Sequence, residues 1–587
     1  MLRTIKRIGL LLSAKQKLQT FLIILMMLFG ALLETLGIAL IVPVITAVTD
    51  EQAISTNKFH MGDLYSLLGA GSIRQFTVIM LVALIVVFIL KNIYLYFENV
   101  VMLKFIYTNQ FATSRRMMIN FMRRPYSYYL GADTAVIQRN ITSDINNVFA
   151  LILTLLQLAS EVIVFACLVI ILLMVDSGMI LFIAGLLVLV LLVIKTLIKP
   201  VMKKAGTDNQ NYYTGLFKWI QESVMAIKEI KIAGKENYFI DSYSKCGDGY
   251  VNAVQKYTLF SQTPRLLIET VCICGLVGYM LIVIASGKDP ASLVSQLSVF
   301  AAAAARLLPS ANRINNYLTN VSYFEPFLDN VSENLQQEIN DASVSYEMPD
   351  DISGAGTVRE KMDLKKEIVL DGISFQYPGA PSPVLTDAGM VIPVGKSTGI
   401  VGTSGAGKTT AVDIMLGLLT PDKGRILADG VPVSDENSRA FLNNIGYIPQ
   451  TIFMLDSTIR KNVAFGVPDD EIDDEKVWYA LKEAQLDAHV RTLPEGLDTG
   501  IGERGIRLSG GQRQRIGIAR ALYEDPEVLV LDEATSALDN ETEKAIMDSI
   551  NHLHGRKTLI IIAHRLQTIE KCDLIYRVEN EKITRER

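Results

Sequence analysis

The sequence has few cysteines, few charges and little that is typical of disorder. Its 587 residues include only five cysteines, and these do not form the closely spaced pairs that hold zinc or a disulfide framework. Cys272 and Cys274 lie in an apolar run, where a buried thiol packs as a small hydrophobe. Charged residues make up 20% of the chain and hydrophobic residues 50%, the reverse of a disordered composition.

Long apolar runs are what the chain does have. The mean hydropathy is +0.30, and a helix of about 20 apolar residues crosses a bilayer. Buried helices of soluble proteins are shorter, about 11 or 12 residues, and amphipathic, so runs of this length predict a membrane domain. The six expected spans are residues 20–48, 76–96, 148–175, 178–198, 266–286 and 292–308.

Charge divides the chain into two halves of opposite sign. Residues 1–330 carry a net charge of +9, and residues 331–587 carry −14. The connections after the second and fourth spans are long and basic, so the positive-inside rule places them and both termini in the cytoplasm. They keep a helical periodicity, and we therefore expect the helices to extend beyond the bilayer. The acidic half cannot hold a nucleic acid by bulk charge, so any nucleotide must bind at a local site.

Ionisable residues interrupt the apolar runs, where each is expensive unless it faces a partner or a wet cavity. Arg306 and Arg313 are seven residues apart and share one helical face. Guanidinium groups in a cavity suit a phosphate or pyrophosphate, because their fork donates paired hydrogen bonds. The alternative is a structural ion pair with Glu34 or Glu269. Glu34 and Glu161 allow either helix pairing or a role in transport.

Near residue 367 the pattern changes to short β-rich segments alternating with helical stretches, which is typical of an α/β domain with a mainly parallel sheet. The stretch before it is polar, acidic and turn-rich. We therefore divide the chain into a transmembrane domain at 1–329, a linker at 330–366 and an α/β domain at 367–587, which the motifs below identify as a nucleotide-binding domain.

The nucleotide assignment rests first on residues 402–409, GTSGAGKT, which match GxxxxGK[ST] between an apolar strand and a helix. The glycines let successive amides point at phosphate oxygens, and the helix N-terminus adds a favourable dipole. Lys408 supplies charge to the phosphates, and Thr409 offers a hydroxyl to Mg²⁺. Alone, the match could be a glycine-rich turn.

A second motif argues against that alternative. Residues 528–539, VLVLDEATSALD, contain a buried strand that ends in two acids. Asp532 fits a ligand of the Mg²⁺ shell, and Glu533 fits the group that orients or deprotonates the attacking water. The fold class we expect is an all-α six-helix transmembrane domain followed by an α/β P-loop nucleotide-binding domain.

Residues 508–512, LSGGQ, match the signature sequence of the ATP-binding-cassette transporters, and the chain resembles that family. The resemblance implies a half-transporter whose homodimer holds each ATP between the phosphate loop of one copy and Ser509 and Gly511 of the other. Residues 502–505, GERG, resemble a motif of the exporters. The resemblance also implies Mg²⁺ as a cofactor, an ATPase coupled to export, and a bacterial inner membrane location with the nucleotide-binding domain in the cytoplasm.

Further positions match the family pattern one at a time. Tyr377 looks like the aromatic that stacks on adenine, although a core tyrosine is the alternative. Gln450 looks like the residue that contacts Mg²⁺ and the attacking water, and His564 like the one that holds the γ-phosphate. The expected catalytic residues are Glu533, His564 and Gln450, and the metal residues are Thr409, Gln450 and Asp532. The expected nucleotide-binding residues are Tyr377, Gly402, Thr403, Ser404, Gly405, Ala406, Gly407, Lys408, Thr409, Thr410, Ser509, Gly510, Gly511 and Gln512.

Among exporters, the chain is similar to bacterial lipid-linked oligosaccharide flippases in residues 30–45, 226–239 and 305–314. The likeness implies that Arg306 and Arg313 meet a polyprenyl-pyrophosphate head group in the cavity. The partners we expect are a second copy, membrane lipid and a lipid-linked sugar or other amphiphile, with no nucleic acid. A multidrug or lipid exporter, and an ATP-gated channel or regulatory subunit, are the alternatives.

Overall fold

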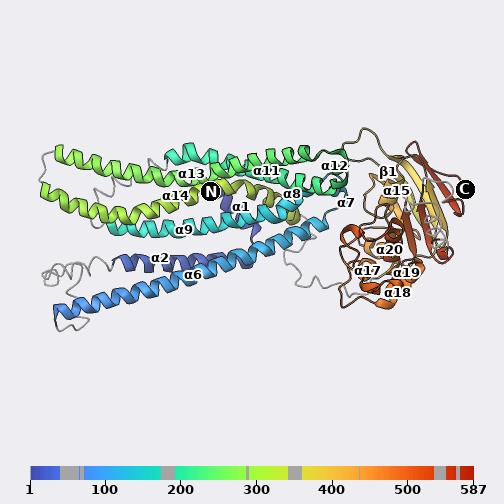
Figure 1. Cartoon of the computed structure of the whole chain (residues 1–587), viewed down its shortest axis with the longest axis horizontal. Coiled ribbons are helices and arrows are strands. Elements are labelled where there is room, and N and C mark those ends of the chain that lie inside the picture. The colour runs from blue at the N-terminus through green and yellow to red at the C-terminus, as the bar shows by residue number, and fades with distance from the viewer. Residues whose placement is uncertain are drawn as a thin grey trace. The chain divides into compact units, whose positions relative to one another are not determined.

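The chain divides into two compact units, residues 1–124 with 132–348, and residues 125–131 with 349–587 (Figure 1). We call them the helical unit and the nucleotide unit. The computed structural model describes residues 2–39, 65, 72–173, 185, 192–285, 290–340, 360–434, 436–533, 550, 552–563 and 569–587.

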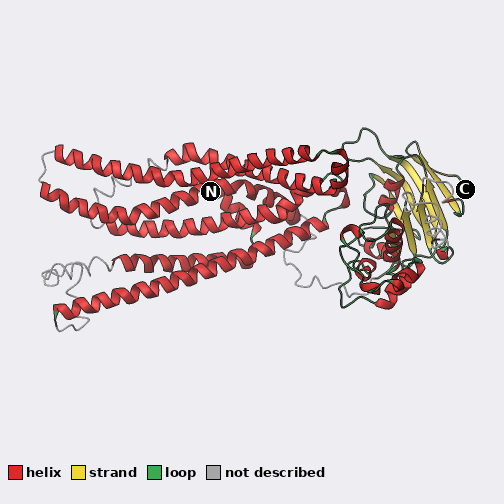
Figure 2. Ribbon diagram, viewed as in Figure 1, coloured by secondary structure: helices red, strands yellow, loops and turns green. Residues whose placement is uncertain are grey.

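The described elements of the helical unit are all helices (Figure 2). Three of its apolar stretches, residues 14–34, 74–123 and 134–167, are long and apolar enough to cross a membrane, among the residues that the structure describes. The elements are α1 (Leu2–Leu11), α2 (Ala14–Ala39), α6 (Ile73–Arg123), α8 (Thr134–Arg139), the π-helical turn η2 (Asn140–Asp144), α9 (Ile145–Leu173), the π-helical turn η3 (Ile194–Ile198), α11 (Lys199–Met225), α12 (Ile227–Ala233), α13 (Glu236–Ala285) and α14 (Pro290–Asn340).

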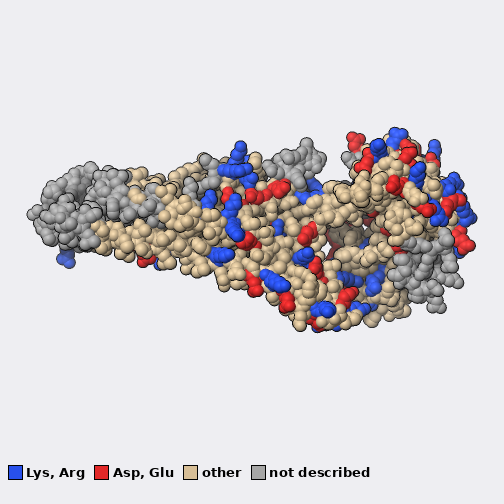
Figure 3. All heavy atoms as spheres, turned by 90° about the horizontal axis from the view of Figure 1, so that it is seen from above, with Lys and Arg blue, Asp and Glu red and all other residues tan. Residues whose placement is uncertain are grey.

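The long helices agree with the expected extension beyond the bilayer. α6 and α14 contain 51 residues each and α13 contains 50. At 1.5 Å per residue each is roughly 75 Å long, more than twice the ~30 Å of hydrocarbon in a bilayer. On the face shown in Figure 3, charged side chains gather over one part of the helical unit and are sparse over the rest. The expected span 178–198 and the end of the first span lie largely outside the described residues.

Two of the extended helices, α11 and α14, meet at a point where only glycine fits. A Cβ at Gly206 of α11 would lie 2.1 Å from the backbone oxygen of Tyr323 in α14. Tyr323 is itself held by Tyr257 of α13, with ring centroids 4.0 Å apart. This close approach joins three helices into one packed layer.

A buried polar cluster ties η2 to α11. The Nε atom of Arg139 donates to Asp144 Oδ2 at 3.1 Å, and Gln210 Nε2 donates to the same oxygen at 3.1 Å. Arg139 also donates to the hydroxyl of Thr214. The Arg139 and Asp144 side chains are almost fully buried, so these contacts hold the helices in one register.

The helix α14 continues past residue 330 and ends at Asn340, within the stretch expected to be a linker. Val331 and Leu335 are fully buried, and their helical spacing keeps this end of α14 packed although its neighbours are polar. On the other side of the linker, Leu364 already belongs to a buried core of the nucleotide unit. That unit is therefore anchored a few residues before 367.

The nucleotide unit contains two sheets. One has the strand order β2-β1-β4-β5 and is antiparallel; the other has the order β10-β9-β3-β8-β7-β6 and is mainly parallel. The strands are β1 (Glu367–Phe375), β2 (Leu385–Pro393), β3 (Ser397–Val401), β4 (Lys423–Ala428), β5 (Val431–Pro432), β6 (Ile445–Ile448), β7 (Val528–Asp532), β8 (Thr558–Ile562), β9 (Leu574–Glu579) and β10 (Lys582–Arg585).

Helices cover the mainly parallel sheet and form a second core. β3, β7 and β8 are buried along their whole length, as a parallel sheet covered on both faces requires. The helices of this unit are α7 (Tyr126–Tyr129), α15 (Lys408–Met415), α16 (Ser438–Leu442), α17 (Ile459–Val463), α18 (Asp474–Glu483), α19 (Asp487–Thr492) and α20 (Gly510–Leu522).

We expect Gly206→Ala to destabilise the helical unit by about 1–3 kcal/mol, because its new methyl group meets a backbone atom that cannot rotate away. The matched control is Gly247→Ala in α13, where a Cβ meets nothing within 4 Å and alanine favours the helix. The check is the thermal unfolding midpoint of the purified full-length variants. A Gly206→Ala midpoint equal to that of the unmodified protein would contradict this packing.

Candidate nucleotide-binding site

The phosphate loop connects the buried strand β3 to α15. Gly407 has φ +100° and ends the loop as the N-cap of α15, and a Cβ there would lie 2.7 Å from Val384 Cγ1. A Cβ at Gly402 would lie 2.4 Å from the carbonyl oxygen of Val578. Both positions therefore need glycine, and the loop brings the N-terminus of α15 to the end of the sheet.

Lys408 is folded back onto its own loop. Its Nζ atom donates to the carbonyl oxygens of Gly402 at 3.1 Å and Thr403 at 3.0 Å. Burial lowers the pKa of Lys408, and the nearby carboxylates of Glu533 and Asp532 oppose that shift. The ammonium group is thus placed where phosphate oxygens could replace two carbonyl oxygens as its partners.

Gln450 and Glu533 meet because of the register between β6 and β7. Ile448 pairs with Leu531, and the two polar residues each lie two positions later. The Nε2 atom of Gln450 donates to Glu533 Oε2 at 2.8 Å. Glu533 has φ +48°, a left-handed conformation that a residue with a side chain rarely adopts, so surrounding contacts hold it in place.

Asp532 is the last residue of β7, directly before Glu533, and it is buried, with 6% of its surface exposed. Burial raises its pKa and the charge of Glu533 adds to the rise, while hydrogen bonds from Tyr447 and Thr409 oppose it. The Tyr447 hydroxyl donates to Asp532 Oδ2 at 3.3 Å. Asp532, the Thr409 hydroxyl and the Gln450 amide provide hard oxygen donors, which fit Mg²⁺.

This donor set is incomplete without a ligand. Among the residues that the structure describes, no three His, Cys, Asp or Glu side chains are grouped closely enough to hold a metal ion. Mg²⁺ commonly binds through one or two protein groups together with substrate phosphates and water. The chemistry therefore fits a metal that arrives with a nucleotide.

Tyr377 lies next to the helix that follows the loop. Its hydroxyl is 3.0 Å from Thr410 Oγ1, and its ring packs edge to face on Phe375 with centroids 5.0 Å apart. The ring is partly exposed, so it combines a core contact with an accessible surface. Both sequence interpretations of Tyr377 thus remain compatible with its position.

The LSGGQ segment forms the N-terminus of α20. Ser509 Oγ accepts a hydrogen bond from Gln512 N at 3.2 Å, and Gln512 Oε1 accepts one from Ser509 N at 2.8 Å. This reciprocal capping box fixes the first turn, while Ser509 and Gly510 stay exposed. The exposed end of the 13-residue helix offers amide groups and a positive dipole to an anion.

Models of two protein regions match the chain: the ABC transporter transmembrane region at residues 20–282 and the ABC transporter domain at residues 385–536. Together they take in more than half of its length. The chain belongs to the ABC transporter family.

Two relatives illustrate what this ABC transporter is similar to. An "ATP-dependent lipid A-core flippase" of Burkholderia orbicola is 31% identical over 66% of this chain and 62% of its own length. The "Heterocyst differentiation ATP-binding protein HepA" of a Nostoc species is 33% identical over 62% of this chain and 57% of its own. The matched stretches thus span less than two thirds of either relative.

A solved structure shares the fold. The "Structure of a bacterial Atm1-family ABC exporter with ATP bound" aligns with a TM-score of 0.74, covering 98% of this chain and 95% of that one at 21% identity. The expected order of an all-α transmembrane domain and an α/β nucleotide-binding domain is therefore confirmed.

Some expected site residues lie outside the part of this ABC transporter that the structure describes. These are His564 and the side chain of Arg306. Arg313 is described, and it pairs with Glu161 rather than with either of the partners we considered, Glu34 and Glu269. Its Nε and Nη2 atoms donate to the two oxygens of Glu161 at 2.7 and 2.9 Å. The Ser310 hydroxyl donates to the same carboxylate.

Asp413, which lies one helical turn after Thr409 on α15, was not among the residues expected at the site. Burial raises its pKa to about 6, and the charge of Asp532 adds to the rise. Its i+4 spacing from Thr409 was the available signal. Tyr126 of α7, which belongs to the same unit, lies close enough to Asp413 and Tyr377 for their charges to raise its pKa further after burial. A helix turn from the first basic connection thus adjoins the site.

The raised pKa of Asp413 predicts a pH-dependent stability. Below about pH 4 the carboxyl is protonated in both the folded and the unfolded state. As pH rises from about 4 to about 6 it ionises in the unfolded state but not in the folded state, so the folded state loses stability over this interval and gains none of it back at higher pH. Asp413→Asn lacks this loss and should be more stable than the unmodified protein by about 1–3 kcal/mol at pH 7.5, but not at pH 4.

Thermal unfolding of the nucleotide-free protein at several pH values measures this difference. The exposed Asp470→Asn serves as the control and should show no such divergence. If the difference in unfolding midpoint between Asp413→Asn and the unmodified protein stays constant from pH 4 to 7.5, the raised pKa of Asp413 is contradicted.

Proposed function

We propose that two copies of this chain form an exporter that uses ATP hydrolysis to flip an amphiphilic glycolipid, most specifically a polyprenyl-pyrophosphate-linked oligosaccharide. The observation that carries the proposal is the contact of Gln450 with Glu533, next to the buried Asp532, at the edge of the sheet where the phosphate loop begins. A chain that couples such a site to helices long enough to cross a membrane is suited to move cargo through it.

In the proposed ATP site, Lys408 exchanges its two loop carbonyls for phosphate oxygens. Glu533 accepts a proton from the attacking water, and Gln450 fixes the direction of its carboxylate. Thr409, Asp532 and Gln450 would hold Mg²⁺, which neutralises charge on the phosphates when bound. His564 is proposed to hold the γ-phosphate, and Tyr377 to stack on adenine.

A second copy completes each site in this proposal. The exposed α20 N-terminus, with Ser509, Gly510, Gly511 and Gln512, has amides that can bind a γ-phosphate presented by another chain. ATP would then favour the paired state by its differential affinity, and hydrolysis would release it. The proposed division into domains, with the linker before residue 367, allows the nucleotide units to pair in this way.

The cargo assignment rests on Arg313. One edge of its guanidinium is paired with Glu161, yet 49% of the side chain is exposed while only 12% of Glu161 is. A phosphate head group could therefore reach the guanidinium from the open side. The relatives named as lipid A-core flippases support a glycolipid, and such a glycolipid is the second candidate cargo. Arg306 is proposed to act with Arg313.

Glu533→Gln should lower ATP turnover by at least ~100-fold, because an amide cannot accept the proton of water. It should still allow ATP-dependent pairing of the two copies, since its size and its contact with Gln450 are kept. The measurements are phosphate release and crosslinking of the paired state with ATP. The exposed Glu579→Gln is the control, and normal turnover by Glu533→Gln would refute the ATPase assignment.

The role of Arg313 in cargo binding is tested by comparing a single substitution at Arg313 with a double substitution at Arg313 and Glu161, which leaves the net charge unchanged. Arg313→Gln should stop flipping of a lipid-linked oligosaccharide in proteoliposomes, with basal ATPase kept. If Arg313 binds the head group, Arg313→Gln with Glu161→Gln stays inactive; if the pair is only structural, neutralising both relieves the unpaired Glu161 and flipping returns.

The same liposomes distinguish the candidate cargoes. Parallel assays with a lipid A-core glycolipid and with an uncharged hydrophobic dye show which molecule depends on Arg313. Transport of the dye alone would favour the multidrug alternative. A current that persists in Glu533→Gln would favour the channel alternative.

A further inference from the structure

A pocket between α2 and α6 is not part of the nucleotide site or of the proposed cargo site around Arg313. It has a volume of about 530 Å³, within the range of ligand sites. The two helices lie side by side along this region (Figure 1). The lining residues are Ser13, Lys15, Gln16, Gln19, Leu22, Ile23, Met26, Val101, Lys104, Phe105, Thr108 and Asn109.

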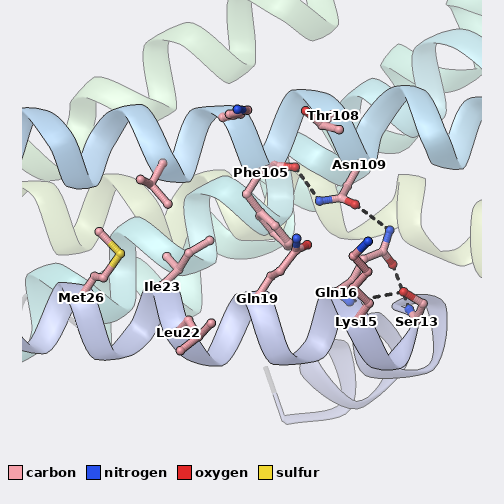
Figure 4. A pocket seen from close by; sticks show the side chains of 12 residues that line it. Ser13, Lys15, Gln16, Gln19, Leu22, Ile23, Met26, Phe105, Thr108 and Asn109 are labelled. Carbon is pink, nitrogen blue, oxygen red and sulfur yellow. Dashed lines mark hydrogen bonds between the residues drawn. The ribbon is translucent and has the colours of Figure 1, made fainter.

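The pocket changes from polar to apolar along its length. Figure 4 shows Ser13, Lys15 and Gln16 at one end of the α2 segment and Ile23 and Met26 toward the other. The expected hydrocarbon spans begin near residue 20 in α2 and end near residue 96 in α6, so the polar end lies where the bilayer meets the cytoplasm.

Hydrogen bonds pre-organise the polar end. Gln16 Nε2 donates to Asn109 Oδ1 at 2.8 Å, and Asn109 Nδ2 donates to the Phe105 carbonyl at 2.7 Å. Gln16 Oε1 also accepts from the Ser13 backbone N–H at 2.9 Å. The bond between Gln16 and Asn109 joins the two helices, and the other two fix the side chains of this pair, as the dashed lines in Figure 4 show.

The charge of the pocket has one sign. Lys15 and Lys104 line it, and none of the lining residues is acidic. Neither ammonium group is within ion-pair distance of a carboxylate among the residues that the structure describes. Two such lysines beside an apolar trough call for a ligand with an anionic head and a hydrocarbon tail.

We propose that this pocket binds an anionic phospholipid of the cytoplasmic leaflet as a resident lipid, separate from the transported cargo. The phosphate lies between Lys15 and Lys104, and one acyl chain runs along Leu22, Ile23 and Met26. The volume holds the head group and the first part of the chain, and the remainder extends into the bilayer. Bound there, the lipid joins α2 to α6 at the level where both helices leave the membrane.

Native mass spectrometry of the delipidated full-length protein tests the site, with phosphatidylglycerol and phosphatidylcholine of identical chains as probes. We expect phosphatidylglycerol adducts to outnumber phosphatidylcholine adducts. Lys15→Gln and Lys104→Gln should each weaken phosphatidylglycerol binding roughly fivefold, and both together roughly thirtyfold. Lys17→Gln, on the same helix but not lining the pocket, should leave it unchanged.

A variant at the apolar end separates tail binding from surface charge. Val101→Trp fills part of the trough and should weaken phosphatidylglycerol binding although it removes no charge. Circular dichroism spectra and thermal midpoints confirm that each variant is folded.

Four results would overturn the proposal. They are equal binding of the two lipids, an equal loss with Lys17→Gln, inorganic phosphate competing as well as the lipid does, and adducts that occur on single chains but vanish from the dimer. The last would mean that a second copy covers the pocket. Because lipid adducts are counted without ATP or cargo, the result does not depend on the proposed transport function.

Discussion

The register of the mainly parallel sheet is the constraint on which the nucleotide unit depends. β3, β8, β7 and β6 are neighbours, and parallel strands end at one edge. Because these strands pair in step, the phosphate loop, Asp532 and Gln450 all follow at that edge. β3, β7 and β8 are completely buried, and the pairing itself records the register: Ile448 lies opposite Leu531, and Asp532 lies opposite Ile562.

Much of this unit could be predicted from sequence because its signals are local. The phosphate loop at 402–409 and the two acids Asp532 and Glu533 are each formed by consecutive residues, so each motif can be recognised from the sequence alone. Contacts between residues that are distant in the sequence could not be predicted in this way. The left-handed conformation of Glu533 and the folded-back Lys408 depend on neighbouring strands and on carbonyl groups that no spacing rule describes.

In the helical unit, too, local properties could be predicted from the sequence and contacts between distant segments could not. Length and hydropathy predicted helices that continue beyond the bilayer, because both properties accumulate along one segment. They could not predict the partner of Arg313, since a contact between α14 and α9 joins residues about 150 positions apart. They also could not predict that α14 continues to Asn340, because the buried Val331 and Leu335 are outnumbered by polar neighbours in that segment.

The π-helical turns η2 and η3 have a consequence for how this chain can change over evolutionary time. A π turn accommodates one residue more than an α turn, and each residue of an α-helix rotates the chain by about 100°. Loss of one residue from an ordinary α-helical turn would therefore rotate everything after it by that angle. Loss of one residue from 140–144 instead converts the π turn to an α turn, and α8 and α9 keep their relative rotation. Single-residue deletions in these two short segments should therefore disrupt the helical unit less than single-residue deletions in the neighbouring α-helical turns, because the flanking helical faces stay in phase.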